Sequence, residues 1–239
     1  MINRLAICAA AFCFVYSTGI SSAADPMLVT AGAARLDTYD QDNTEFFALS
    51  IQPEGEDIVA LTTDVVVLFD TSASQSGEYR TAALETLQTF LKTLGNNNTV
   101  KLIAVDVDAN ILTDSFLAAQ SSQMQDAFSK LSRRVPLGST DMAKAIQAAT
   151  ESYTEPGSNR RAILYIGDGL SAAKTTSSPA FQDQVAECRE KQIPFNSFAI
   201  GPNTDPLFLA TLANQTGGRL LTDGASITPD VAASHLVKA

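Results

Sequence analysis

The feature that most constrains the fold of this chain is a short, almost wholly apolar run, residues 64–69, that ends abruptly in polar residues. A brief run rich in valine is typical of a central strand in a parallel sheet, where both faces are buried. Residues 70–74 follow directly and read Asp-Thr-Ser-Ala-Ser. Because open α/β sheets bind ligands at the carboxyl ends of their strands, we expect a polar site immediately after this strand.

Candidate strands and helices alternate along the rest of the chain. Further strands are expected at residues 100–107, 162–166 and 195–200. Asp205 is expected to cap a helix that begins at Pro206, because aspartate accepts hydrogen bonds from a first helical turn and proline fits its first position. Such alternation favours a parallel sheet covered by helices on both faces.

The N-terminus has the pattern of a signal peptide over residues 1–24. Arg4 gives a positive start, residues 5–16 form an apolar core, and residues 22–24 form a small-residue cleavage site. The core is too short for a comfortable membrane span. We expect a secreted, periplasmic or cell-envelope protein with no membrane insertion after cleavage. An uncleaved anchor is the alternative.

Two further regions follow the signal peptide in this interpretation. Residues 25–60 are expected to form an N-terminal extension with one strand at residues 46–51, after a polar, turn-rich stretch at residues 38–43. Residues 61–239 are expected to form the main domain.

The charge of the chain limits its partners. The sequence has 16 basic and 26 acidic side chains, for a net charge of −10. Cleavage would remove Arg4 and leave 15 basic and 26 acidic side chains, for a net charge of −11. Such an acidic surface argues against binding to nucleic acid or to anionic membranes. It favours binding to basic partners or to cations.

Cleavage would also leave Cys188 as the sole cysteine, because Cys8 and Cys13 lie in the signal peptide. No internal disulfide could then form. Cys188 follows Val185 at helical spacing, which indicates a buried structural thiol. A reactive or partner-linking thiol is the alternative.

Oxygen-bearing side chains recur in three separate segments of the sequence. The first contains Asp70, Ser72 and Ser74, the second contains Thr140 before a helix-like segment, and the third contains Asp168 after a short apolar strand. Together they resemble the metal-ion-dependent adhesion site (MIDAS) of von Willebrand factor type A (VWA) domains, which reads Asp-x-Ser-x-Ser, a distant Thr and a distant Asp. The resemblance covers roughly residues 60–239.

The resemblance implies a fold. In this family a doubly wound, mostly parallel six-stranded α/β sheet of Rossmann-like type carries helices on both faces. Its strand order is 3-2-1-4-5-6 and its third strand is antiparallel. The first and fourth strands would then be neighbours, which brings Asp70 and Asp168 together at the topological switch.

The resemblance also implies a metal. Ser72 and Ser74 would be direct ligands, Thr140 a direct ligand in the partner-bound state, and Asp70 and Asp168 ligands directly or through water. Hard oxygen donors suit Mg²⁺, or alternatively Mn²⁺ or Ca²⁺, and do not suit zinc. Two carboxylates offset the charge of the ion while hydroxyls add none, so the metal would retain affinity for a Glu or Asp carboxylate of a partner protein or matrix component.

Other interpretations of the same residues are structural. Ser72 and Ser74 could cap the following helix, Thr140 could cap the helix after it, and Asp168 could belong to an Asp-Gly turn. Gly167 stands where many family members have threonine, and we expect this change to alter loop geometry without removing a ligand.

A second set of polar residues lies outside this motif. Asp106, Asp108 and Asp114 fall near a strand end, where a solvated loop is favoured over a Ca²⁺ site. His235 is the single histidine and is expected at the surface.

The resemblance favours an exported, metal-dependent, adhesion-type protein-binding module that is not an enzyme. An architectural subunit of a larger envelope assembly is the alternative. A metal-assisted hydrolase is less favoured, because the sequence has no Gly-x-Ser-x-Gly elbow, no P-loop and no histidine near the serines of the motif.

Overall fold

The computed structural model describes seven stretches of the chain, residues 29–31, 34–41, 44–51, 62–153, 159–171, 179–223 and 228–237. The chain divides into two compact units, and the boundary lies between Val59 and Ala60. The predicted signal peptide, residues 1–24, lies outside the described residues, so its cleavage stays a prediction.

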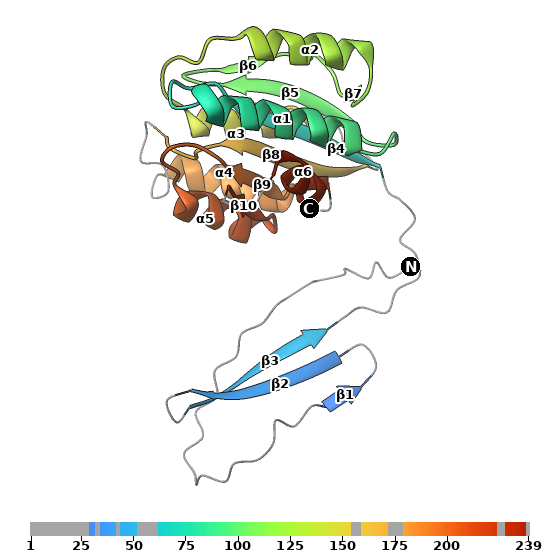
Figure 1. Ribbon diagram of the computed structural model, residues 1–239, viewed down its shortest axis with the longest axis vertical. Helices are drawn as coiled ribbons and strands as arrows, with labels where there is room; N and C mark the ends of the chain where they lie inside the picture. Colours follow the sequence, from blue (N-terminus) through green and yellow to red (C-terminus); the bar gives the residue numbers. More distant parts are fainter. Residues whose placement is uncertain are drawn as a thin grey trace. The chain divides into compact units, whose positions relative to one another are not determined.

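The N-terminal unit contains a three-stranded antiparallel sheet, β1 (Val29–Ala31), β2 (Ala34–Gln41) and β3 (Thr44–Ile51), in that order (Figure 1). The expectation of a single strand here was wrong. β2 is polar and lacks a clear apolar period, but it pairs along its whole length with the more apolar β3. Tyr39 of β2 stacks on Phe46 of β3 with ring centroids 5.2 Å apart, a cross-strand contact that supports the hairpin.

The second unit is built on a seven-stranded sheet in which six strands form a continuous path. Their order is β10-β9-β8-β4-β5-β6, and every pair is parallel except the antiparallel β5 and β6. This confirms the doubly wound order with an antiparallel third strand. The strands of the path are β4 (Thr63–Asp70), β5 (Thr99–Val105), β6 (Ala109–Ile111), β8 (Arg160–Gly167), β9 (Phe195–Ala199) and β10 (Leu220–Thr222).

The seventh strand, β7 (Leu117–Ala118), was not predicted. It pairs antiparallel with the start of β5. Two residues are too few to carry a strand period, so pairing with a neighbour is what defines this element.

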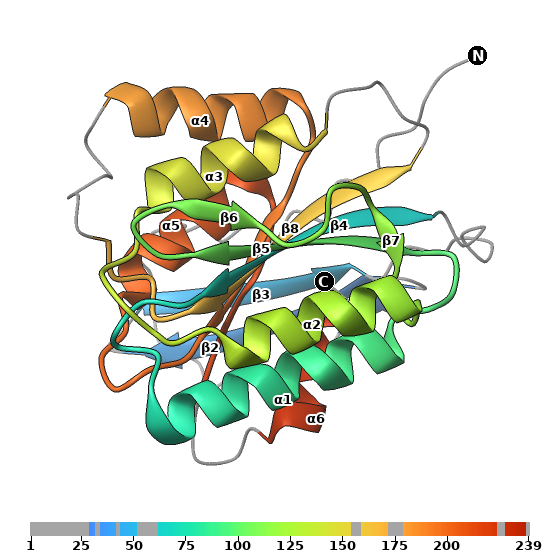
Figure 2. The ribbon, with the colours of Figure 1, turned by 90° about the horizontal axis from the view of Figure 1, so that it is seen from above.

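Helices cover both faces of the sheet. In Figure 2, α3, α4 and α5 lie on one face, and α1, α2 and α6 lie on the other. The helices are α1 (Gly77–Thr93), α2 (Ser122–Arg133), α3 (Met142–Glu151), α4 (Pro179–Glu190), α5 (Pro206–Thr216) and α6 (Pro229–Val237). None of the helices in the described stretches combines the length and apolar character that a membrane span requires.

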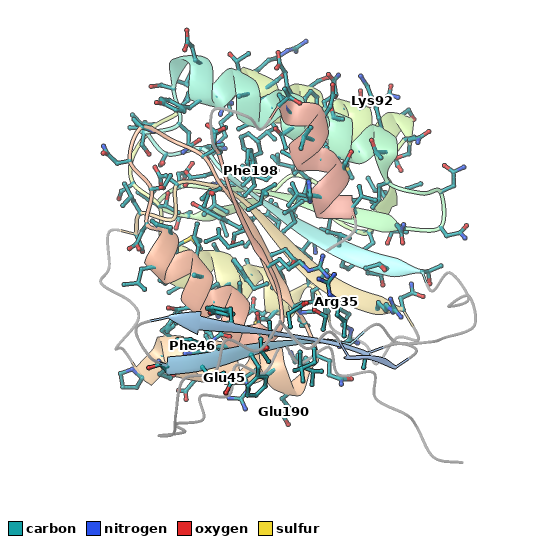
Figure 3. All side chains as sticks on the ribbon, turned by 60° about the horizontal axis from the view of Figure 1, so that its bottom comes forward. Arg35, Glu45, Phe46, Lys92, Glu190 and Phe198 are labelled. Carbon is teal, nitrogen blue, oxygen red and sulfur yellow. The ribbon has the colours of Figure 1, made fainter. Side chains whose placement is uncertain are left out.

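The sheet separates two hydrophobic clusters. Val65, Val67 and Phe69 of β4 face α1 and α6, whereas Val66 and Leu68 face α3 and α5. Phe198 of β9 joins the first cluster, on the side of α1 and α6 (Figure 3). Burial on both faces explains why β4 is apolar without alternation, and it fixes where the strand ends.

Helix α5 begins and ends as its sequence predicts. Asp205 is the N-cap, and its Oδ1 accepts a hydrogen bond of 2.9 Å from the backbone N–H of Phe208. Pro206 occupies the first helical position, and Gly217 ends the helix in the left-handed conformation with φ of 80°.

Candidate metal centre

Three segments that are distant in sequence meet at the carboxyl edge of the sheet. Asp70 is the last residue of β4, and Asp168 directly follows β8. Because β4 and β8 are paired neighbours, the two carboxylates come from adjacent strand ends. Thr140 precedes α3 and forms a parallel bridge with Ser171, just after Asp168.

The five side chains of the predicted motif are joined by hydrogen bonds. Asp70 Oδ1 accepts from the backbone N–H of Ser72 at 2.8 Å, and its Oδ2 accepts from the Thr140 hydroxyl at 2.9 Å. The hydroxyl oxygens of Ser72 and Ser74 are 2.9 Å apart. The Ser74 hydroxyl then donates to Asp168 Oδ2 at 2.5 Å. The structure therefore brings all five residues into one network.

Burial makes this network electrostatically demanding. Asp70 and Asp168 are fully buried, and within the described residues neither forms an ion pair with lysine or arginine. Burial raises the pKa of Asp70, and the nearby charge of Asp168 raises it further, while hydrogen bonds from Tyr165 and Ser72 lower it. Two buried carboxylates without a cation are costly, so a set made only of carboxylate and hydroxyl oxygens fits a hard divalent ion.

The structure also decides the capping alternatives. The N-cap of α1 is Ser76, so neither Ser72 nor Ser74 caps that helix. The N-cap of α3 is Asp141, whose Oδ1 accepts from the backbone N–H of Lys144 at 3.1 Å, so the capping interpretation of Thr140 was wrong.

Asp168 combines a turn contact with a place in the network. Its Oδ1 accepts from the backbone N–H of Leu170 at 2.9 Å, as in an Asp-Gly turn, while its Oδ2 faces Ser74. The turn therefore orients this carboxylate and leaves its second oxygen toward the centre.

Sequence reasoning missed one residue at this centre, Tyr165 of β8. Its hydroxyl donates to Asp70 Oδ2 at 2.6 Å and accepts from the backbone N–H of Gly169 at 3.1 Å. Burial raises the pKa of this phenol well above its usual value, so it acts as a neutral donor. The only signal in the sequence is a tyrosine inside the otherwise apolar run of residues 162–166, three residues before Asp168.

Gly167 is explained by this tyrosine. A Cβ atom at position 167 would overlap the Cβ of Asp70 and would lie 2.5 Å from the hydroxyl oxygen of Tyr165. Glycine therefore permits the backbone of β8 to approach Asp70 and the Tyr165 ring closely. From the sequence we expected only a change in loop geometry at this position, and the structure assigns it this packing role.

Two carboxylates outside the motif, Asp106 and Asp108, form ion pairs with basic side chains. Asp106 forms an ion pair of 2.6 Å with Arg134 and accepts from the Thr71 hydroxyl at 3.1 Å. Burial raises the pKa of Asp106, but hydrogen bonds from Arg134, the backbone of Asp108 and Thr71, together with the charge of Arg134, outweigh this and leave it lowered. Exposed Asp108 pairs with Lys144 at 2.6 Å. No group of three or more Asp, Glu, His or Cys residues in the described part of the chain could hold a metal ion.

Two other predicted residues lie away from the centre. Cys188 is buried in the cluster beneath α4, and burial raises the pKa of its thiol to about 11, as expected for a structural cysteine. His235 is exposed on α6.

Comparison with known proteins gives a family match over most of the second unit. A family model described as the von Willebrand factor type A domain matches residues 63–221. Among curated proteins, the chain is similar to the inter alpha-trypsin inhibitor heavy chain 4 of Mus musculus, with 24% identity over 170 residues. That match covers 68% of this chain and 18% of the mouse protein, so the chain spans less than a fifth of this relative.

Solved structures share the fold. A von Willebrand factor type A protein from Catenulispora acidiphila aligns with a TM-score of 0.63 and 15% identity, over 86% of this chain and 44% of that one. The manganese-loaded TRAP protein of Plasmodium vivax aligns with a TM-score of 0.51 and 16% identity, over 64% of this chain and 63% of that one.

Proposed function

The chain belongs to the von Willebrand factor type A domain family, and from this premise we propose that it is an exported, non-enzymatic binding module that uses a MIDAS-bound divalent cation to capture an acidic residue of a partner protein. The observation that carries the proposal is the single, largely buried network that joins two carboxylates and three hydroxyl side chains. Export rests on the sequence of residues 1–24 alone.

Each member of the network has a distinct part in this proposal. When bound, a cation supplies an electrophilic site for one further anionic oxygen. Asp70 and Asp168 provide the charge that holds it, and Ser72, Ser74 and Thr140 provide neutral oxygens that leave its charge only partly offset. The residual positive charge is what a partner carboxylate would meet.

The donor set restricts the class of ion. Carboxylate and hydroxyl oxygens suit Mg²⁺, with Mn²⁺ and Ca²⁺ as alternatives. The similar TRAP protein is manganese-loaded, which supports a divalent ion of this kind.

A binding role is favoured over catalysis because no histidine lies beside the serines of the motif. The single histidine, His235, lies exposed on α6, away from the motif. The carboxylate in reach of the Ser74 hydroxyl, that of Asp168, holds the cation in this proposal, so neither Ser72 nor Ser74 has a free base to activate it as a nucleophile.

Calorimetric titration with Mg²⁺ and Mn²⁺ tests the metal centre. We expect the full chain to bind one ion at the motif, and Asp70→Ala and Asp168→Ala to lose that binding while circular dichroism shows an intact fold. Asp108→Ala is the matched control, because Asp108 is an exposed carboxylate whose contact is Lys144. Equal binding by Asp70→Ala and the parent chain would refute the proposal.

A further inference from the structure

Exposed apolar side chains gather in the loops around the metal centre. Eight large apolar residues of the described second unit are exposed, and six of them lie in loops or first helical turns at the carboxyl edge of the sheet: Tyr79 of α1 and five aliphatic residues. We call these five the apolar rim, and their exposed fractions run from 42% to 77%. The rim consists of Val107, Val135, Leu137, Leu170 and Leu207.

One side of the rim is tied to the motif loop. The backbone N–H of Leu137 donates to the carbonyl of Thr71 at 3.0 Å, and Ala73 donates to the carbonyl of Gly138 at 3.0 Å. Val107 packs on the same loop, because its Cγ1 lies 3.0 Å from the position that a Cβ of Gly138 would take. These contacts fix the apolar side chains beside Ser72 and Ser74.

The other side of the rim is tied to Asp168. Leu170 donates its backbone N–H to Asp168 Oδ1 at 2.9 Å. Leu207 lies in the first turn of α5, and the cap of that helix, Asp205, donates its backbone N–H to the Asp168 carbonyl at 2.8 Å. The rim therefore has members on both sides of the centre, held by backbone hydrogen bonds.

We infer that the apolar rim is a docking surface for a protein segment that carries one acidic residue flanked by large apolar side chains. The inference rests on the proposed function, because the acidic residue would meet the cation. Clustered exposed apolar side chains mark interaction surfaces, and each leucine or valine removed from water on docking contributes to binding.

Charge restricts the rest of the partner. Arg134 and Lys144, which lie at this edge, are already ion-paired with Asp106 and Asp108. An acidic partner surface would be repelled by a chain with a net charge of −10. The fitting partner thus presents a single carboxylate within an apolar patch, on a surface that is otherwise neutral or basic.

Selection from a displayed random peptide library tests the composition of this partner. The library is bound to the immobilised full chain in Mg²⁺ and eluted with EDTA. We expect enrichment of peptides with one Asp or Glu beside Leu, Ile, Val or Phe. Enrichment of acidic peptides without apolar neighbours would overturn this inference and leave the proposed function standing, whereas no EDTA-eluted peptides at all would overturn both.

Rim variants test the surface itself, with the most enriched peptide as the probe. We expect Leu137→Ser and Leu207→Ser to weaken peptide binding by about ten-fold each, as the loss of one apolar anchor would. Their Mn²⁺ affinity should match the parent chain. Ile111→Ser and Val231→Ser are matched controls, because these residues are 53% and 41% exposed on β6 and α6, outside the rim.

Two results would overturn the inference at this stage. One is parent-like, Mg²⁺-dependent peptide binding by both rim variants. The other is a dimer of the parent chain in sedimentation that Leu137→Ser abolishes, because the rim would then bind a second copy of the chain.

Discussion

Asp70 is held by a neighbouring side chain that carries no charge. Tyr165 reaches its carboxylate from β8, and the absence of a side chain at Gly167 makes the approach possible. A neutral phenol can orient the carboxylate without neutralising it, which keeps the negative charge that a cation requires. Groups that orient metal ligands in this way commonly change metal affinity when they are removed.

We therefore expect Tyr165→Phe to weaken Mn²⁺ binding by about 10- to 100-fold. Tyr153→Phe is the matched control, because this second buried tyrosine also uses its hydroxyl, toward the carbonyls of Asp64 and Ala162, far from the motif. Both variants should lose about 1–2 kcal/mol of unfolding free energy, since each removes buried hydrogen bonds. Calorimetric titration with Mn²⁺ distinguishes the two variants, because only Tyr165→Phe should lose metal affinity. Equal affinity in both would show that Tyr165 does not position Asp70.

Cys188 gives the chain a predictable response to alkaline pH. The pKa of its thiol is raised from 9.0 to about 11 by burial, so the folded state resists ionisation. Stability from this group is complete below pH 9 and is lost as the pH rises toward 11. We expect the loss to reach about 1.4 kcal/mol at pH 10.

Urea unfolding of the parent chain and of Cys188→Ala at pH 7 and pH 10 measures this loss. The variant lacks the thiol and should show a smaller decrease between the two pH values. An identical decrease in both proteins would assign the effect to other groups.

At the element scale, the sequence predicts an element well when its own residues determine it. β4 and β8 contain short apolar runs where both faces of the strand are buried, and α5 carries its cap and its terminator. β2 and β7 were missed because pairing with neighbouring strands, and not their own pattern, makes them strands.

The cap of α5 offers a test at this scale. Asp205→Ala removes the acceptor for the backbone N–H of Phe208, so we expect a loss of about 1 kcal/mol of unfolding free energy. Mn²⁺ affinity should persist, because the contact of this residue with Asp168 comes from its backbone N–H. Asp183→Ala, an exposed aspartate within α4, should change stability by less than about 0.5 kcal/mol. A large loss of Mn²⁺ affinity in Asp205→Ala would contradict this assignment.

The candidate centre was predictable for a related reason. The order of the strands follows from the family pattern, and it places Asp70 and Asp168 at adjacent strand ends. The hydrogen bond from Tyr165 to Asp70 depends on how one side chain packs past Gly167. Neither the spacing of residues nor the composition of the sequence predicts such a contact.

At the scale of the whole molecule, both hydrophobic clusters are drawn from residues 65–237. The N-terminal unit has its own sheet. We expect a chain that begins at Ala60 to unfold with the same midpoint and bind Mn²⁺ with the same affinity as the full chain. Thermal unfolding in Mn²⁺ and in EDTA compares the two, and a lower midpoint for the shorter chain in both conditions would show that the N-terminal unit stabilises the second.

The two ends of the main sheet have a consequence for behaviour at high concentration. β6 and β7, which share one border, contain three and two residues, and β10, which forms the other border, contains three. Such brief borders offer an incoming strand few free backbone groups, so copies of the sheet have little opportunity to join side by side into fibrils. High concentrations of the chain should therefore leave this unit dispersed.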